Sequence, residues 1–359
     1  MMSEETNDQI EQRRANIRAL ETAGREPFPT AWTPTHVTSD VARSYEEQHG
    51  DAREPDSPVR VSIAGRMTAR RVMGKASFFD ISDERGRLQV YLARDTVGED
   101  FYNEVFRQLL DLGDILGVSG EVFRTRTGEI TIRAEQVHLL AKSTRPLPVV
   151  KSSDGEVYHD VSDPEFRYRQ RYVDLAIHPE VRENFRQRGQ LIATLRRFLD
   201  EQGYLEVETP VLQPLYGGAA ARPFTTWHNT LDMEMFLRIA PELYLKRLIV
   251  GGFEGVYELG KDFRNEGLSR LHNPEFTMLE LYVAHRDADW MMGLVEEMIT
   301  TLAQSIGGSP TRSWRGHEIS LEGPWPRRPF YELLDEQLGD RPSVRGMDRT
   351  SLEALLEEL

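Results

Sequence analysis

The chain has 359 residues, of which 39% are hydrophobic, and its formal net charge at pH 7 is −15. A chain of this length predicts more than one domain, each with its own hydrophobic core. It has no cysteine, no run of roughly 20 apolar residues, and an acidic, polar segment from Met1 to Thr6. These features exclude disulfides, Cys-type zinc sites and a membrane helix, and we expect a cytoplasmic protein without a membrane partner.

The acidic balance argues against nucleic-acid binding over the whole surface, and we expect no DNA partner. The charge is uneven, however, because residues 60–87 carry seven Lys or Arg side chains against three Asp or Glu. A local basic face of this kind indicates either a nucleic-acid footprint or a solvated charged surface, and the composition leaves both open.

The first 145 residues predict a helix followed by a small barrel. Residues 9–23 show helical spacing that ends before Pro27, and residues 36–58 are polar and predict a connector, so 1–58 forms one unit. Alternating patterns then predict strands at 59–63, 78–81, 88–92, 115–123 and 129–132, with a helix over 99–112. Short strands with one helix in about 85 residues favour an OB-fold barrel over 59–145.

A proline-containing linker follows at 146–180, and a second domain is predicted from 181 to 359. Helices are expected at 181–201, with Gly203 as its stop, at 241–250, and at 289–306. A short strand over 204–210 ends at proline, and two apolar runs near 256–259 and 276–281 enclose a polar loop. The expected fold class is α+β and multidomain.

The polar loop contains an arginine, carboxylates, a histidine and an aromatic residue within fourteen positions, 263–276. Such a set suits a nucleotide triphosphate, because arginine binds phosphate bidentately and an aromatic ring stacks on a purine. The alternative is a surface loop held by an Arg–Glu ion pair. If the second strand covers 275–282, Phe276, Met278, Glu280 and Tyr282 share one face and Thr277, Leu279 and Leu281 share the core face.

The segment Gly255 to Asp262 approaches the phosphate-binding pattern G-x-x-x-x-G-K-[ST]. Asp262 occupies the position of the Ser or Thr that should hold magnesium, and it would place a negative charge beside phosphates. The interior Val-Tyr-Glu-Leu is also typical of a strand. We therefore interpret this segment as the first strand of the strand–loop–strand unit.

These segments resemble class II aminoacyl-tRNA synthetases. The strand–loop–strand unit resembles their motif 2, and residues 204–210 resemble the end of motif 1. Several longer strings are similar to lysyl-tRNA synthetases in particular, and the similarity runs from about residue 10 to residue 300. They are Tyr204 to Pro210, Gly217 to Phe224, Leu237 to Arg247, Phe263 to Thr277, Met73 to Phe78, Asp111 to Asp114 and Arg167 to Tyr172.

The resemblance implies ATP-dependent ligation of L-lysine to tRNA(Lys) through a lysyl-adenylate, by a homodimer that uses ATP and Mg²⁺. Arg264 would bridge the α-phosphate and the substrate carboxylate, Glu266 would read the adenine amino group, and Phe276 would stack on the ring. His272 and Asn273 would lie near the phosphates. The implied lysine-binding residues are Gly218, Glu242, Arg264, Glu280 and Tyr282, and the implied catalytic residues are Arg264, Glu266 and His272.

In the OB-fold, the resemblance implies that Phe78 stacks on an anticodon base while Arg71, Gln89 and Glu129 read base edges. Stacking combined with base-edge hydrogen bonds is the usual way of reading single-stranded RNA. This role would account for the basic residues between positions 60 and 87.

The chain departs from the family pattern in two places. Leu271 stands where bacterial relatives often have an arginine, which leaves the role of neighbouring Arg270 open. The Gly-rich motif 3 is not found before Leu359, so the resemblance implies a catalytic domain truncated before its second ATP-binding arginine and its magnesium ligands. No metal ligands are expected within 1–359, and little adenylate formation is expected from this chain.

Two alternatives stay open. One is an aspartate- or asparagine-type class II enzyme, whose pocket needs a cation for the substrate carboxylate. The other is a non-catalytic synthetase paralogue that binds tRNA or other RNA.

Overall fold

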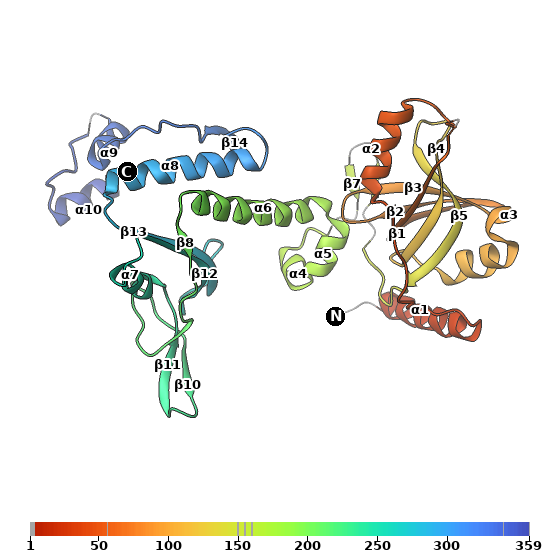
Figure 1. The fold of residues 1–359 in the computed structure, drawn as a ribbon, viewed down its shortest axis with the longest axis horizontal. Helices are drawn as coiled ribbons and strands as arrows, with labels where there is room; N and C mark the ends of the chain where they lie inside the picture. Colours follow the sequence, from red (N-terminus) through yellow and green to blue (C-terminus); the bar gives the residue numbers. More distant parts are fainter. Residues whose placement is uncertain are drawn as a thin grey trace. The chain divides into compact units, whose positions relative to one another are not determined.

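A computed structural model describes residues 4–55, 57–148, 151–153, 156–158, 161–339 and 341–358. The chain divides into two compact units, Met1–Phe185 and Arg186–Leu359. Figure 1 shows the elements of both units along the chain. The boundary lies within helix α6 (Pro179–Glu201), close to the predicted domain start at 181.

The first unit contains a closed five-stranded barrel with the strand order β1-β2-β3-β5-β4. The strands are β1 (Val59–Met73), β2 (Ala76–Ser82), β3 (Arg87–Ala93), β4 (Ile115–Arg124) and β5 (Ile130–Ala141). All pairs are antiparallel except β3 with β5, which is parallel. The predicted OB-type barrel is confirmed, although β1 and β5 extend well beyond the predicted apolar runs.

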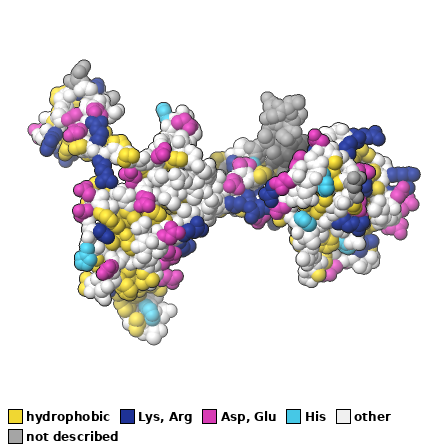
Figure 2. Space-filling view, turned by 45° about the horizontal axis from the view of Figure 1, so that its top comes forward, with side chains coloured by type: hydrophobic (Ala, Val, Ile, Leu, Met, Phe, Trp, Pro, Cys, Tyr) yellow, Lys and Arg dark blue, Asp and Glu magenta, His cyan; other side chains and the backbone are white. Residues whose placement is uncertain are grey.

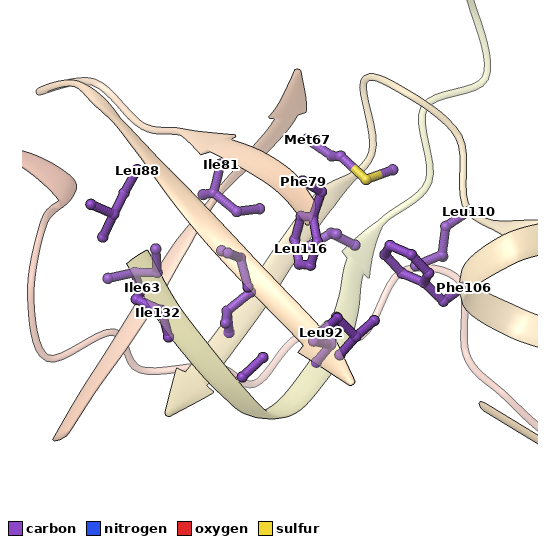
Figure 3. Close-up of a cluster of buried hydrophobic side chains, with 14 of the residues drawn as sticks. Ile63, Met67, Phe79, Ile81, Leu88, Leu92, Phe106, Leu110, Leu116 and Ile132 are labelled. Atoms are coloured by element: carbon purple, nitrogen blue, oxygen red, sulfur yellow. The ribbon is translucent and has the colours of Figure 1, made fainter. Parts of the chain in front are cut away.

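The barrel interior is filled by side chains that alternate inward along each strand. Figure 3 shows Ile63, Phe79, Ile81, Leu88, Leu92, Leu116 and Ile132 converging on this interior. Phe106 and Leu110 cover one side of it, from and just after the π-helix η1 (Phe101–Leu109). Period-two alternation is what allows a strand to bury one face while it exposes the other. The predicted helix over 99–112 is confirmed, although most of it is the π-helix η1 and the short helix α3 (Arg94–Val97) precedes it.

The predicted connector 36–58 is wrong in part, because it contains helix α2 (Thr38–His49). Val41 and Tyr45 are buried in the barrel's core cluster, at helical spacing within an otherwise polar segment. The Thr38 hydroxyl and amide both donate to Asp83, at 2.8 and 2.7 Å. Tertiary packing of two apolar residues thus stabilises helix α2, which the polar composition of this segment does not predict.

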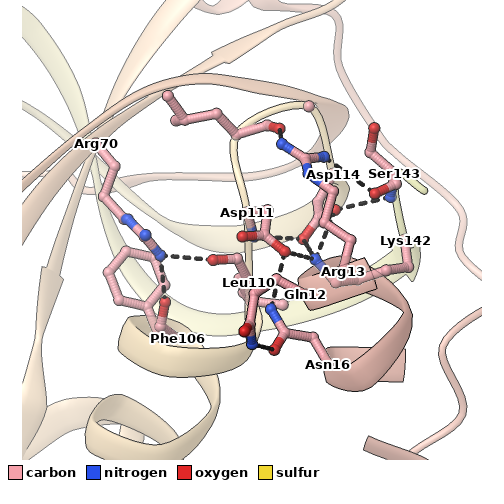
Figure 4. A network of polar contacts seen from close by, with 12 residues as sticks. Gln12, Arg13, Asn16, Arg70, Phe106, Leu110, Asp111, Asp114, Lys142 and Ser143 are labelled. Carbon is pink, nitrogen blue, oxygen red and sulfur yellow. Dashed lines mark hydrogen bonds and ion pairs between the residues drawn. The ribbon is translucent and has the colours of Figure 1, made fainter. Parts of the chain in front are cut away.

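Helix α1 (Glu4–Thr22) agrees with the predicted helix and is held by a buried polar network, shown in Figure 4. Lys142 is buried and bonds Asp114 at 2.8 Å and also Asp111. Asn16 of α1 donates to Asp111 at 3.1 Å, and Arg13 donates to the carbonyl oxygens of Leu112, Ser143 and Arg145. The network fixes the helix to the barrel through charges that are paired and hydrogen-bonded, as buried charges must be.

The predicted linker 146–180 also contains regular structure in its described part. A two-stranded hairpin pairs β6 (Lys151–Ser153) with β7 (Glu156–Tyr158), and helices α4 (Pro164–Arg169) and α5 (Arg171–Ile177) follow. Asp174 is fully buried and contacts Arg167 and His178, at 2.7 and 2.8 Å, and also Arg171. This carboxylate joins α4 to α5.

The second unit is built around the predicted strand–loop–strand hairpin. Its strands β12 (Gly255–Phe263) and β13 (Glu275–Val283) pair antiparallel, and β8 (Leu205–Glu206) joins β12 in parallel. A second sheet has the order β10-β11-β9, formed by β10 (Thr225–His228), β11 (Met233–Leu237) and β9 (Leu212–Gln213). Helix α7 (Glu242–Val250) agrees with prediction, whereas only two residues of the predicted strand 204–210 are extended.

One face of the hairpin forms the core of this unit. Tyr257, Leu279 and Leu281 pack with Phe198 and Leu199 of α6 and with Leu294 of helix α8 (Ala288–Ser305). Gly203 ends α6 with a φ of +82°, as predicted for a helix stop. The last described elements are β14 (Thr311–Trp314), β15 (His317–Ser320), α9 (Phe330–Leu338) and α10 (Arg349–Glu358).

Charged side chains of both signs are interspersed on the face of the molecule shown in Figure 2. The net charge of −15 is therefore not gathered into one acidic field on that face. Within the described residues, no helix is both long and apolar enough to cross a membrane.

Candidate active site and nucleic-acid interface

The polar face of the β12–β13 hairpin is set by its register. Val256, Glu258, Gly260 and Asp262 lie directly opposite Tyr282, Glu280, Met278 and Phe276. Because directly opposed residues in an antiparallel pair point to the same side, these eight residues share one face. The predicted split of β13 into a core face and a polar face is confirmed by the packing of Leu279 and Leu281 on the other side.

Arg264 follows β12 and lies against the ring of Phe276, with its Cζ atom 5.0 Å from the ring centroid. The Arg264 amide donates to the Pro274 carbonyl at 2.8 Å, which fixes the backbone at the entrance to the loop. Its Nε atom is buried and has no hydrogen-bond partner among the described residues. The arrangement brings a cation and an aromatic ring together where the sequence predicted phosphate binding and purine stacking.

The loop between the strands is open. Glu266, His272 and Asn273 are exposed, and His272 Nδ1 lies 2.7 Å from the Ser269 hydroxyl. The Glu266 carboxylate accepts a hydrogen bond from the Arg222 amide at 3.4 Å. Leu271, the departure from the family pattern, is 90% exposed. The predicted residues Glu266, His272 and Asn273 thus lie at the rim of the polar face.

Glu280 and Tyr282 lie together on the polar face, and the Tyr282 hydroxyl donates to Glu280 Oε2 at 3.3 Å. Burial raises the pKa of the Glu280 carboxyl, and the negative charges of Asp262 and Glu242 raise it further. The Tyr282 hydrogen bond and the positive charge of Arg238 act in the opposite direction on this pKa. Burial also raises the pKa of Tyr282, so its hydroxyl stays protonated and able to donate.

Gly218 and Glu242 are brought together from separate segments, as expected for two residues that share a ligand. A Cβ atom at Gly218 would lie 2.8 Å from the Glu242 Cβ, and the φ of Gly218 is +89°. Both the space and the backbone conformation therefore require glycine here. Glu242 also pairs with Lys246, one helical turn away, at 2.5 Å.

Sequence reasoning missed the buried charges beneath this site. Arg238, Glu258 and Asp262 are 2%, 4% and 0% exposed. Arg238 contacts Glu258 and lies 3.2 Å from Asp262, and Glu258 accepts hydrogen bonds from the Thr209 hydroxyl and amide at 2.6 and 3.2 Å. The available signal for Glu258 and Asp262 was that they alternate onto one face of β12, whereas Arg238 lies outside the hairpin. The near-match to a phosphate loop is resolved as strand β12, with Asp262 facing an arginine.

A groove of about 920 Å³ on the barrel contains three of the four predicted anticodon residues, Arg71, Phe78 and Gln89. Glu129 does not line it; its carboxylate lies 3.7 Å from Arg87, and its backbone pairs with Thr125. Gln89 accepts a hydrogen bond from the Thr131 hydroxyl at 3.1 Å, which orients its amide.

The same groove contains residues that sequence reasoning missed. Tyr91 lies 5.1 Å from Phe78, and Phe123 lies 6.3 Å from Tyr91, measured between ring centroids. The Arg133 guanidinium lies 4.7 Å from the Phe123 centroid. Aromatic rings interleaved with arginines suit unpaired bases and a phosphate backbone. The alternation of side chains between the two faces of β3 and β4 was the sequence signal that could have predicted Tyr91 and Phe123 on the outer face.

A metal site was tested against the described residues. Among them, no group of three or more His, Asp or Glu side chains could hold a metal ion. The buried carboxylates Glu258 and Asp262 are paired with Arg238 instead. No chemical step is therefore assigned to a metal held by these residues.

Comparison with known proteins assigns both units to families. The family of class II tRNA synthetases (D, K and N) matches residues 163–357, and the OB-fold nucleic acid binding domain matches residues 61–140. A lysine–tRNA ligase of Porphyromonas gingivalis is 44% identical over 360 residues, which cover 99% of this chain and 61% of that relative. With its motif 2 hairpin and its anticodon-type barrel, the chain belongs to the class II tRNA synthetases of the D, K and N group.

Proposed function

We propose that this protein is a lysine–tRNA ligase. A carboxylate oxygen of L-lysine attacks the α-phosphorus of ATP, the bond to the β-phosphate breaks, and lysyl-adenylate and pyrophosphate form. A hydroxyl of the terminal adenosine of tRNA(Lys) then attacks the lysyl carbonyl, and AMP leaves. The protein forms no covalent bond in either step, so its contribution is positioning and charge neutralisation.

The observation that carries the choice of lysine is the charge of the polar face. Glu258, Asp262 and Glu280 share this face, Glu242 raises the pKa of Glu280 by its charge, and Arg238 is the buried cation among them. Four carboxylates outnumber the three nearby cations Arg238, Arg264 and Lys246, and the field stays net negative. That field favours a substrate whose side chain ends in an ammonium group and opposes one that ends in a carboxylate.

The other residues take roles that fit their positions. Arg264 neutralises the α-phosphate and the substrate carboxylate, while Phe276 beneath it offers a ring for the adenine. Glu266 reads the adenine amino group at the rim, and His272 and Asn273 face the phosphates. Gly218 and Glu242 hold the α-amino group of lysine, and Glu280 with Tyr282 holds the ε-ammonium group.

In the barrel, we propose that Phe78 stacks on an anticodon base and that Arg71 and Gln89 read base edges in the groove they share. We also propose that Glu129 reads a base edge. It lies beside the groove, because its backbone pairs with Thr125, which lines the groove. The tRNA partner is supported by the match of residues 61–140 to a nucleic-acid-binding fold.

A cytoplasmic homodimer that uses ATP with Mg²⁺ completes the proposal. Apolar side chains around the motif 1 segment are exposed in this chain, which supports a second copy as their cover: Leu205 47%, Leu212 47% and Leu215 77%. Magnesium would accompany ATP, and no protein ligand for it is assigned.

The test is ATP–pyrophosphate exchange by the protein that the complete gene encodes, with lysine, aspartate and asparagine offered separately. Exchange with lysine alone is the expected result. Exchange with aspartate or asparagine would assign the protein to another member of its group. Binding of tRNA without exchange for any of the three would identify a non-catalytic paralogue.

A further inference from the structure

Arg238 has no role in the proposed reaction, yet it is one of the most enclosed side chains in the described structure. It is 2% exposed and heads the fully buried side chains by volume. It directly follows strand β11, and its guanidinium extends along the polar face of β12. A buried arginine is costly unless several partners bind it, so each of its contacts has to be accounted for.

Two of the three guanidinium nitrogens, Nη1 and Nε, have several partners each. Nη1 donates to the Thr209 carbonyl and hydroxyl at 3.3 and 3.1 Å and also contacts Glu258. Nε donates to the Lys261 carbonyl at 2.9 Å and lies 3.2 Å from Asp262 Oδ1. The Asp262 oxygens accept no hydrogen bond from the described residues, so the adjacent Arg238, together with the charge of Arg264, balances this fully buried carboxylate.

Gly260 provides the space for this arrangement. A Cβ atom at Gly260 would lie 2.1 Å from Arg238 Nη2 and 3.4 Å from Cζ. Contacts that short do not occur, so any side chain at this position would displace the guanidinium. Glycine in the middle of a strand often marks the close approach of another group, and here that group is Arg238.

Arg238 also holds the end of the strand from which Arg264 extends. The Phe263 amide donates to the Arg238 carbonyl at 3.0 Å, one residue before Arg264. The side chain of Arg238 also donates from Nε to the Lys261 carbonyl. The backbone and the side chain of Arg238 therefore both hold residues 261–263 in place. Displacement of this arginine would therefore move the backbone that aims Arg264.

A second consequence concerns the charge of Glu280. The groups that face Glu280 are Tyr282 on its own strand, Glu258 and Asp262 on β12, Glu242 on α7, and Arg238 after β11. Arg238 is the cation that acts on Glu280 itself, whereas Lys246 pairs with Glu242 and the charge of Arg264 acts on Asp262. Removal of Arg238 would leave Glu280 among three other carboxylates, and protons would bind to the group at higher pH.

We propose that Arg238, seated over Gly260, is a positioning residue of the amino-acid-activating site: it fixes the strand end that aims Arg264 and keeps Glu280 charged for a cationic substrate. This inference rests on the proposed function. It predicts two separable effects, one from the planar geometry of the guanidinium and one from its positive charge.

Three variants separate the two effects: Arg238→Lys keeps the charge without the planar fork, Arg238→Met removes both, and Gly260→Ala displaces the guanidinium without changing any charge. Each is made in the protein that the complete gene encodes. The measurements are kcat and the KM for lysine in ATP–pyrophosphate exchange across pH, together with thermal melting. Arg286→Lys and Gly189→Ala are the controls, because Arg286 is an exposed arginine stacked on Trp290 and Gly189 has open space around it.

We expect kcat to fall at least about tenfold in all three variants, because small misplacements at a reacting centre are costly. The KM for lysine should rise as pH is lowered. In Arg238→Met this rise should begin at a pH about one unit higher than in the wild type, whereas Arg238→Lys should keep the wild-type pH profile. Both controls should match the wild type.

Wild-type kcat in both Arg238→Lys and Gly260→Ala would overturn the positioning role, and an unmoved pH profile in Arg238→Met would overturn the role in charging Glu280. If Arg238→Met does not fold, the Gly260→Ala variant decides: lower kcat at an unchanged melting temperature supports the proposal, and unchanged kcat rejects it. Failure of the proposed function is distinguishable, because the wild type would then show no exchange with lysine.

Discussion

The two units of this protein place charge differently. In the barrel, the interior is apolar, and the residues suited to RNA lie in a groove on the outer surface. In the second unit, only one face of the β12–β13 hairpin packs into a core, and the other face carries buried carboxylates and a buried arginine. The residues proposed to bind RNA thus lie apart from the barrel core, whereas the proposed amino-acid site and the core of the synthetase unit use opposite faces of the same strands.

The difference has a physical origin. Bases and phosphates can be bound from an exposed surface, where aromatic rings and arginines remain solvated until the ligand arrives. A small charged amino acid is discriminated best inside a site of low dielectric, where each charge has a larger effect. At the proposed lysine site the second unit buries charges, and it balances them in the Arg238–Glu258–Asp262 cluster.

The largest expected effect concerns one of the buried charges of the first unit, Lys142 beside the barrel. Lys142→Met should lower the free energy of unfolding by about 3–5 kcal/mol in urea titrations, because it leaves the buried Asp114 without its cation. Exposed Lys75→Met is the control and should change little.

The pH dependence of that variant has a definite sign. Burial already raises the pKa of Asp114 above its usual value, although Lys142 counters the rise. A carboxyl whose pKa is higher in the folded state contributes stability at low pH and loses it as pH rises. The destabilisation by Lys142→Met should therefore shrink as pH falls, and a loss that is small and independent of pH would contradict the role of this ion pair.

The second prediction tests whether the polar face of the synthetase unit is catalytic. Arg264→Lys should lower kcat/KM in ATP–pyrophosphate exchange about 100- to 1,000-fold, since a lysine cannot bind phosphate and carboxylate bidentately. Thermal melting should change little. Arg286→Lys, which alters an exposed arginine stacked on Trp290, is the matched control. Equal activity of the two variants would contradict the role of Arg264.

The third prediction sharpens the link between buried charge and substrate choice. Glu280→Gln should raise the KM for lysine about 30-fold, the equivalent of about 2 kcal/mol for an unpaired buried charge. Because burial raises the pKa of Glu280, the wild-type KM for lysine should also rise as pH falls through that elevated pKa. The glutamine variant should lack this rise, and the exposed control Glu254→Gln should keep it.

The smallest effect is expected on the outer surface of the barrel. Phe78→Ala should weaken tRNA binding by about 1–3 kcal/mol in filter-binding assays, the usual contribution of one stacked base. Pyrophosphate exchange and the melting temperature should stay unchanged, because Phe78 lies in the groove and outside the apolar core. Phe330→Ala, at a 72% exposed phenylalanine of the second unit, is the control. Unchanged tRNA affinity would refute the stacking role.

Much of the fold could be predicted from local patterns. Alternation located all five barrel strands, and helical spacing together with Gly203 and Pro241 located α6 and α7. Several elements were missed, among them α2 and the helices of the 146–180 region. These are polar segments stabilised by a few long-range contacts, such as Tyr45 in the barrel core and Asp174 with its arginines. Such contacts leave little trace in a local window of sequence.

The candidate site divides in the same way. Motif resemblance predicted Arg264, Phe276, Glu280 and Tyr282, and strand parity assigned three of them to one face. The sequence by itself determined this assignment to one face, because successive side chains of a strand point to opposite faces whatever surrounds the strand. Only the tertiary structure decided that Arg238 lies across Gly260 between Glu258 and Asp262, and that Tyr91 and Phe123 join Phe78 in one groove. These contacts connect residues far apart in the chain, so they depend on packing and register, which no local pattern records.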